Sequence, residues 1–161
     1  MDSTASSAEE HFRRGGNAFD AGDHASALED FRAAARLDSA NATYRSYLGL
    51  VTGLSERRLD QALELCRDAA REEFFQPLHY HNLALLHLAF GFKAEAIRYL
   101  RRGLMIDPDN EEIDAALRRM GIRRRPPLAF LRRQSFVNRW IGRLLGRPVS
   151  APQPELTLFV I

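Results

Sequence analysis

A period of 34 or 35 residues is the feature of this sequence that most constrains its fold. Gly15 recurs as Gly49 and Ala84, and three further sets recur with the same spacing: Ala27, Ala62 and Ala96; Phe31, Cys66 and Leu100; and Ala34, Ala69 and Gly103. The extra residue of the second unit falls between Gly49 and Ala62, where residues 53–56 are expected to form a turn that absorbs it. Such self-similarity is typical of a repeat protein whose units pack on their neighbours.

Each unit is expected to form two amphipathic helices joined by a short turn. In the first unit the apolar spacing predicts helices over 8–21 and 24–37, with Gly22 and Asp23 as stop and start signals. The recurring small residues lie where the two helices of a hairpin approach closely, because overpacking by larger side chains there costs about 1–3 kcal/mol. The third unit carries the fullest set: Tyr80, Leu83, Ala84, Gly91, Ala96, Leu100, Gly103 and Pro108.

This pattern of aromatic residues, a Leu-Gly pair, recurring alanines and a closing proline resembles the tetratricopeptide repeat (TPR) family. The resemblance covers three repeats, 8–41, 42–76 and 77–110, although Cys66 replaces an aromatic residue and Phe74 stands where proline is usual. It implies an all-α, right-handed solenoid of three helical hairpins. Residues 111–121 are expected to form a capping helix with Asp109 as its N-cap, since Glu112 follows three residues later. Residues 1–7 are expected to be a disordered N-terminus.

By this resemblance, the first helix of each repeat lines a concave groove. The residues predicted to bind a peptide there are Phe12, Phe19, Leu50, Leu54, His81, Leu85 and Leu88. The alternative for any one of them is ordinary packing between helices. Family members that grip a carboxylate tail use Lys, Asn and Arg at positions held here by Phe12, Gly16, Tyr47, Leu78 and Asn82. A groove without those cations is not expected to bind an Hsp70 or Hsp90 tail.

The formal net charge of +2 is divided unevenly along the chain. Residues 1–117 hold 13 Lys and Arg against 20 Asp and Glu, whereas residues 118–161 hold 10 Arg against one acid, Glu155. Prolines 126 and 127 end the solenoid, and residues 122–150 are predicted to form an Arg-rich segment with a basic amphipathic helix. The residues predicted to contact an anion or a partner are Arg123, Arg124, Arg125, Arg139, Trp140 and Arg143.

Several interpretations of this basic segment stay open. Its apolar stripe can pack on the solenoid or plug the groove, contact a protein partner, or mediate self-association. Trp140 beside a basic face also suits an anionic membrane surface, and the arginines can pair with the acidic solenoid. Nucleic acid fits less well, because no recognised binding motif accompanies the charge. Residues 151–161 are expected to be an apolar tail that docks in a pocket or stays disordered.

No catalytic, cofactor or metal site is predicted. His79 and His81 point to different faces of a helix, and no Cys, Asp or Glu completes a set of metal ligands with His87. The single cysteine, Cys66, excludes an internal disulfide and is expected to be inert packing, and no secretory signal is expected, so a cytoplasmic location follows. The longest apolar stretch, 83–90, is too short to span a bilayer.

The sequence therefore predicts a cytoplasmic scaffold or adaptor, not an enzyme, that binds a protein or peptide. Its concave groove would hold an apolar helix or peptide, and the Arg-rich segment would be a second contact or a plug docked in the chain's own groove. Two alternatives are carried. One is peripheral attachment to an anionic membrane through residues 128–147, and the other is a role like that of type III secretion chaperones.

Overall fold

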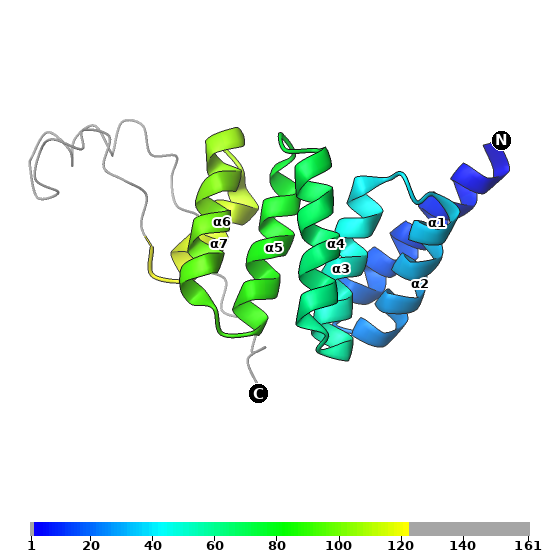
Figure 1. Ribbon diagram of the computed structural model, residues 1–161, viewed down its shortest axis with the longest axis horizontal. Coiled ribbons are helices and arrows are strands. Elements are labelled where there is room, and N and C mark those ends of the chain that lie inside the picture. Colours follow the sequence, from blue (N-terminus) through cyan, green and yellow to red (C-terminus); the bar gives the residue numbers. More distant parts are fainter. Residues whose placement is uncertain (1, 123–161) are drawn as a thin grey trace, which may run out of the picture. The chain divides into compact units, whose positions relative to one another are not determined.

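The computed structural model describes residues 2–122, and these form seven helices and no strand (Figure 1). The helices are α1 (Asp2–Asp20), α2 (His24–Leu37), α3 (Ala42–Glu56), α4 (Leu59–Glu72), α5 (Pro77–Ala89), α6 (Lys93–Ile106) and α7 (Glu111–Arg119). The prediction of three helical hairpins followed by a capping helix is confirmed for this part of the chain. The predicted C-terminal helix and apolar tail lie outside the described residues.

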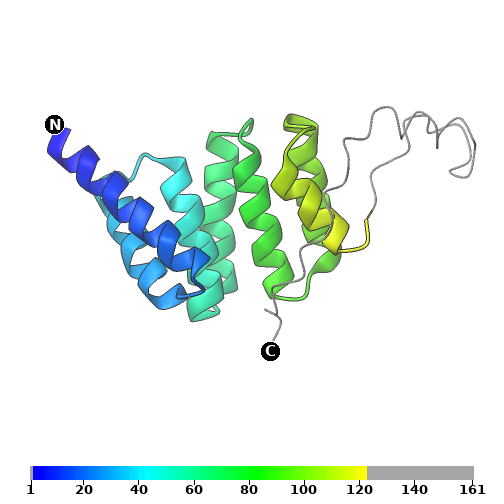
Figure 2. The same ribbon diagram turned by 180° about the vertical axis from the view of Figure 1, so that it is seen from behind.

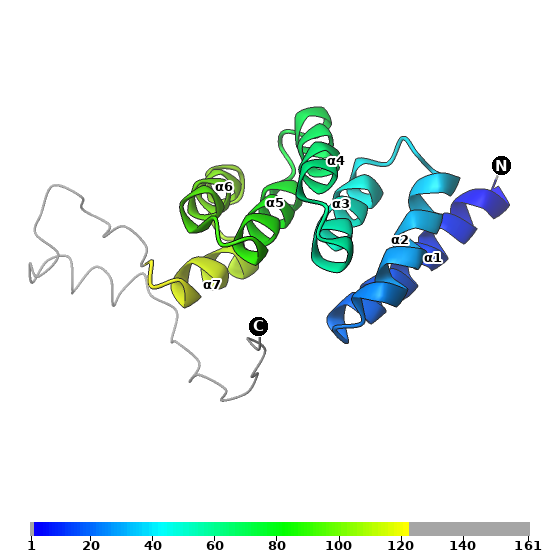
Figure 3. The same ribbon diagram turned by 60° about the horizontal axis from the view of Figure 1, so that its bottom comes forward.

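The helices form two layers. Each hairpin pairs α1 with α2, α3 with α4, or α5 with α6, and α2 contacts α3 while α3 and α4 both contact α5. Figure 1 shows α2, α4 and α6 in front, and the reverse view in Figure 2 brings α1, α5 and α7 forward. Figure 3 shows the stack tilted, with α7 beside α5 and α6 at its end. The turns between hairpins lie along one edge of the stack and the turns within hairpins along the opposite edge.

Small residues permit the close approach of paired helices, as the repeat spacing predicts. A Cβ atom added at Gly15 would lie 2.8 Å from the Phe31 ring, and one at Gly49 would lie 2.7 Å from the Sγ of Cys66. Both distances are shorter than van der Waals contact. The recurring alanines are fully buried in the same way: Ala27, Ala62, Ala84 and Ala96.

The turn of the second hairpin lies later than predicted. Helix α3 continues to Glu56, so residues 53–56 are helical and the turn falls at Arg57 and Arg58. Gly53 is therefore inside the helix, and a Cβ atom added there would lie 2.2 Å from the Cδ1 of Leu86 in the next hairpin. The one-residue excess of the second repeat therefore lies in helix α3 rather than in a turn, and Gly53 packs against the next hairpin.

The ends of two helices also differ from the prediction. Helix α1 begins at Asp2 rather than at residue 8, so the expectation of a disordered stretch over 1–7 is wrong for residues 2–7. Asn110, not Asp109, caps α7, since its Oδ1 accepts a hydrogen bond from the Ile113 N–H at 3.1 Å. The Asp109 N–H instead donates to Asp107 Oδ1 at 3.2 Å, which places Asp109 in the turn that precedes the helix.

The core runs through the stack as three neighbouring clusters of buried side chains. The last cluster joins Ala84 and Leu100 to Ile113 and Leu117, so α7 covers the apolar face of the third hairpin. An uncovered final repeat would leave that face in water. No helix within residues 2–122 has the length and apolarity needed to cross a membrane.

Candidate functional site

A groove with a cavity of about 580 Å³ opens on the layer formed by α1, α3, α5 and α7. Along α1, α5 and α7 its lining residues recur at steps of three or four, which place side chains on one helical face. They are Phe12, Arg13, Gly16, Phe19 and Asp20 of α1, Tyr47 of α3, His81, Asn82 and Leu85 of α5, and Glu112, Ala115 and Arg119 of α7.

Aromatic rings form the apolar wall of the groove. Phe12 packs against Tyr44, Tyr47 and Phe31 with ring centroids 4.8, 5.2 and 5.5 Å apart. Phe19 meets the edge of Tyr47 at 6.5 Å. Burial raises the pKa of the Tyr47 hydroxyl, and the nearby carboxylates of Glu112 and Asp20 raise it further. The phenol therefore stays protonated at neutral pH and can donate a hydrogen bond to a bound ligand.

Buried polar groups anchor the floor of the groove. Asn82 is only 1% exposed, and its Nδ2 donates to the Oγ of Ser46 at 3.1 Å. The Ser46 carbonyl in turn accepts from the Sγ of Cys66 at 3.3 Å. Because these bonds connect α5, α3 and α4, they fix the floor in one arrangement.

His81 lies between the groove and the turn that precedes α7. Its Nδ1 is 3.8 Å from the Oε2 of Glu112, and its buried Nε2 has no hydrogen-bond partner. Burial lowers the pKa of His81, and this effect outweighs the opposing influence of Glu112. The imidazole is therefore neutral at pH 7.

Four of the seven predicted groove residues line this cavity: Phe12, Phe19, His81 and Leu85. Leu50 does not, because it is fully buried in the core beside Leu83 and Leu86, and its prediction as a groove residue is corrected. Leu54 and Leu88 are partly buried and pack against core clusters. Helix α3 is flanked by α1, α4 and α5, so it presents only Tyr47 to the cavity.

Helix α7 contributes to the groove, although the sequence predicted only that it covers the last repeat. Glu112, Ala115 and Arg119 complete the groove from its far side. Their spacing in the sequence indicates a second exposed face of this helix, since they follow one another at steps of three and four opposite the buried Ile113 and Leu117. The contacts predicted at Arg123, Arg124, Arg125, Arg139, Trp140 and Arg143 lie outside the described residues.

Cys66 is a buried, unreactive thiol that packs in the core. Burial raises the pKa of its thiol to about 12, so the nucleophilic thiolate is scarcely populated at neutral pH. The residues that the structure describes contain no group of three or more His, Cys, Asp or Glu that could hold a metal ion.

The stacked hairpins and the open groove define a helical-repeat module. Comparisons with known proteins show which repeat it resembles. Residues 80–110, most of the third hairpin, match the family model of the tetratricopeptide repeat. Similar solved structures include the Arabidopsis OM64 TPR domain, with TM-score 0.59, 21% identity, and coverage of 73% of this chain and 97% of that one. The first TPR of Spaghetti (RPAP3), bound to an HSP90 peptide, also has TM-score 0.59, with 18% identity and coverage of 73% and 94%.

The crystal structure of MamA is similar as well, with TM-score 0.52, 21% identity, and coverage of 72% of this chain and 70% of that one. No curated protein sequence matches the chain. The family model therefore matches one repeat of the chain, and the solved structures show that the described residues have the fold of a tetratricopeptide-repeat array.

Proposed function

We propose that this protein is an adaptor that holds an apolar helix or peptide of a partner protein in the groove. The observation that carries the proposal is the cavity of about 580 Å³, in which Phe12, Phe19, Tyr47 and Leu85 are only half buried. Covering their exposed apolar area with a ligand contributes about 25 cal/mol per Å² before the costs of binding are subtracted. A helix or peptide with apolar side chains at regular spacing supplies such a cover.

The charges of the groove favour an internal segment over a C-terminal carboxylate as the ligand. The two cations in the lining, Arg13 and Arg119, are balanced by Asp20 and Glu112. The structure of Spaghetti is bound to the HSP90 peptide SRMEEVD. In this chain Phe12, Gly16 and Tyr47 occupy positions that serve carboxylate binding in family members of that kind, so we propose apolar contacts in place of a carboxylate clamp.

Gly16 offers a sharp test of the proposal. It lines the cavity, and a Cβ atom added there meets nothing within 4 Å. Gly16→Gln should therefore fill the groove without disturbing the fold, and Gly16→Ala is the matched control that leaves it open. Affinity capture with the full chain and mass spectrometry should recover a set of partners that Gly16→Ala keeps and Gly16→Gln loses. Equal recovery with both variants would show that the groove is not the binding site.

The Arg-rich segment is proposed as a second contact or as a plug of the same groove. Since residues 123–161 hold eight Arg and one acid, Glu155, they suit an acidic repeat array. If the segment is a plug, a chain ending at residue 121 should bind groove ligands more tightly than the full chain. Unchanged or weaker binding would contradict the plug. The cytoplasmic location and the chaperone-like role stay predictions.

Attachment to an anionic membrane remains the alternative function, and it depends on residues outside the described range. It predicts that the chain sediments with anionic liposomes in a manner sensitive to salt, and that Trp140→Ala abolishes this binding. Binding that is indifferent to lipid charge would favour the groove function.

A further inference from the structure

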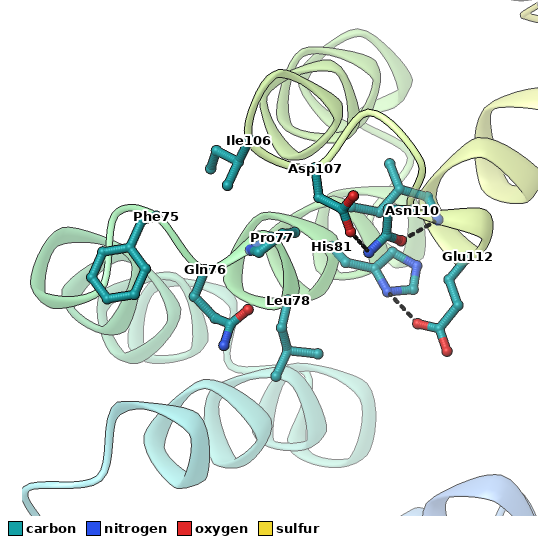
Figure 4. Close-up of a pocket in the computed structure, with 10 residues that line it drawn as sticks. Phe75, Gln76, Pro77, Leu78, His81, Ile106, Asp107, Asn110 and Glu112 are labelled. Atoms are coloured by element: carbon teal, nitrogen blue, oxygen red, sulfur yellow. Dashed lines mark hydrogen bonds and ion pairs between the residues drawn. The ribbon is translucent and has the colours of Figure 1, made fainter.

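A second cavity, of about 430 Å³, opens at the edge of the stack where the turns between hairpins lie, and we call it the edge pocket. Figure 4 shows its lining, which comes from the turn between α4 and α5, the start of α5, the end of α6 and the start of α7. The lining residues are Phe75, Gln76, Pro77, Leu78, His81, Ile106, Asp107, Asn110, Glu112 and Ile113. The edge pocket shares His81 and Glu112 with the groove but has its own rim.

The rim carries apolar side chains that the fold leaves uncovered. Phe75 is 63% exposed and packs edge-on against Phe74, which is 65% exposed, with ring centroids 5.7 Å apart. One pair of adjacent exposed rings therefore lies at this pocket, and Phe75 is the member of the pair that lines it. Exposed apolar clusters of this kind mark interaction surfaces.

The charged groups of the edge pocket have one sign. Asp107 and Glu112 are acidic, His81 is neutral at pH 7, and no residue of the lining is Lys or Arg. The Asp107 carboxylate is held in place by two hydrogen bonds. Its Oδ2 accepts from Asn110 Nδ2 at 3.1 Å (Figure 4), and its Oδ1 accepts from the Asp109 N–H. Each of its oxygens keeps a lone pair for a further donor. The Glu112 side chain is 79% exposed and is accessible to a ligand.

We propose that the edge pocket docks a segment of a partner protein that presents an arginine beside an apolar side chain. A guanidinium donates to carboxylates in a planar fork, so it suits Asp107 and Glu112. Its methylene stem matches the apolar surface of Pro77, Leu78 and Ile106, and the ring of Phe75, at the other end of the lining, suits the neighbouring apolar side chain (Figure 4). A lysine supplies the charge without the planar fork, and an acidic ligand meets like charge.

The charge of the whole repeat array favours the same partner. Residues 2–122 carry 20 Asp and Glu against 15 Lys and Arg, so their field attracts a cationic segment and repels an anionic one. This proposal is separate from the groove function, because its central residue, Phe75, does not line the groove.

A peptide of the required chemistry is available as a probe. Residues 135–147 of the chain place Arg139, Arg143 and Arg147 at steps of four beside Phe136 and Trp140. The chain has one tryptophan, so in the full chain carrying Trp140→Phe the synthetic peptide is the sole source of tryptophan fluorescence. Its emission then reports binding directly.

The expected result is saturable binding that weakens about tenfold with Phe75→Ala and with Glu112→Gln. Phe92→Ala is the matched control, since it removes an exposed ring near the turn between α5 and α6, and it should leave the affinity unchanged, as should Gly16→Gln. A peptide with its three arginines replaced by glutamine should bind at least tenfold more weakly. A peptide with three lysines should fall between the two.

Five outcomes would overturn the proposal. Absence of saturable binding, or equal affinity for the arginine and glutamine peptides, would show that the pocket does not recognise arginine. Equal affinity for the full chain with and without Phe75→Ala would show that the peptide does not bind at the edge pocket. A loss of affinity with Gly16→Gln would show that it binds in the groove. Binding that arises only after Arg139, Arg143 and Arg147 of the full chain are replaced by glutamine would assign the pocket to the chain's own segment rather than to a partner.

Discussion

Arg57 adopts the left-handed conformation at the turn of the second hairpin, with φ +57°, where the other two hairpins have Gly22 and Gly91. A residue with a side chain is strained there by about 1–2 kcal/mol. Contacts with the next hairpin offset the strain. The Arg57 guanidinium lies 4.2 Å from the centre of the Phe90 ring, and its Nη1 donates to the Ala89 carbonyl at 3.3 Å.

Two substitutions of Arg57 separate strain from contact. Arg57→Ala should lower the free energy of unfolding by about 1 kcal/mol, because it loses the contacts and keeps the strain. Arg57→Gly loses the same contacts but relieves the strain, so its stability should lie within about 0.5 kcal/mol of the wild type. Urea unfolding followed by circular dichroism measures both. Equal losses in the two variants would show that the turn is not strained.

Two helical glycines should respond to alanine in opposite directions. Gly16→Ala should stabilise the protein by about 0.5–1 kcal/mol, because alanine is the better helix former and the site is open. Gly53→Ala should destabilise it by about 1–3 kcal/mol, because the new methyl group overlaps Leu86. Thermal unfolding of both variants checks the signs. In a double-mutant cycle, Leu86→Ala should cost less beside Gly53→Ala than alone, and strict additivity would argue against the clash.

At the scale of the element, α7 explains why the third repeat departs from the pattern of the first two. Ala34 and Ala69 recur as Gly103, and a Cβ atom added at Gly103 would lie 2.5 Å from the Cδ1 of Ile113. The third hairpin therefore has a glycine where the capping helix, rather than another hairpin, packs against it. The change from alanine to glycine makes room for Ile113 of the capping helix.

The N-terminus of α7 gives a test of its capping residue. Asn110→Ala should lower the free energy of unfolding by about 1 kcal/mol, because the Ile113 N–H loses its side-chain acceptor. Asp109→Ala is the neighbouring control and should cost less than about 0.5 kcal/mol, because Asp109 joins this turn through its backbone N–H, which alanine keeps. Denaturant unfolding compares the two. A larger loss for Asp109→Ala would restore the original prediction that Asp109 is the cap.

At the scale of the whole molecule, two buried histidines link stability to pH. His81 has an unpartnered buried Nε2, and both ring nitrogens of His87 are buried without a partner while its ring stacks on Tyr99 at 5.2 Å. Burial lowers the pKa of each histidine. Glu112 and Arg119 influence His81 in opposite directions, and so do Glu95 and Arg67 for His87, with burial the largest effect in both cases.

The unfolded chain therefore binds more protons than the folded chain just below pH 6.5, the ordinary histidine value. The stabilisation is fully present above about pH 6.5 and is lost as the pH falls from there through the lowered pKa of the folded state. The melting temperature should decrease as the pH is lowered from 7.5 to 5.5. His81→Gln with His87→Gln should flatten this dependence, whatever its effect on stability at pH 7.5. An unchanged slope in the double variant would assign the dependence to other groups.

The repeat spacing was sufficient to predict the three hairpins, because contacts within a hairpin join residues close in the chain. Gly15, Gly49 and the recurring alanines report those contacts directly. The capping helix was predicted from the capping pattern of Asp109 and Glu112. The exact turns were less predictable. Gly53 has the residue type of a turn but the role of a packing site, and only its neighbour Leu86, in another hairpin, reveals this.

The sequence by itself determined which residues form helices and which helices pair, since local spacing and small side chains set both. Tertiary structure alone decided which apolar residues line the groove. Leu50 and Leu85 are both leucines of first helices, yet neighbouring helices bury the first completely and leave the second at the groove. The edge pocket likewise joins Phe75 of the turn between α4 and α5, Asp107 of the turn between α6 and α7, and Glu112 of α7. Such surfaces depend on how one hairpin lies against the next, and that angle is set by the packing of many side chains at once.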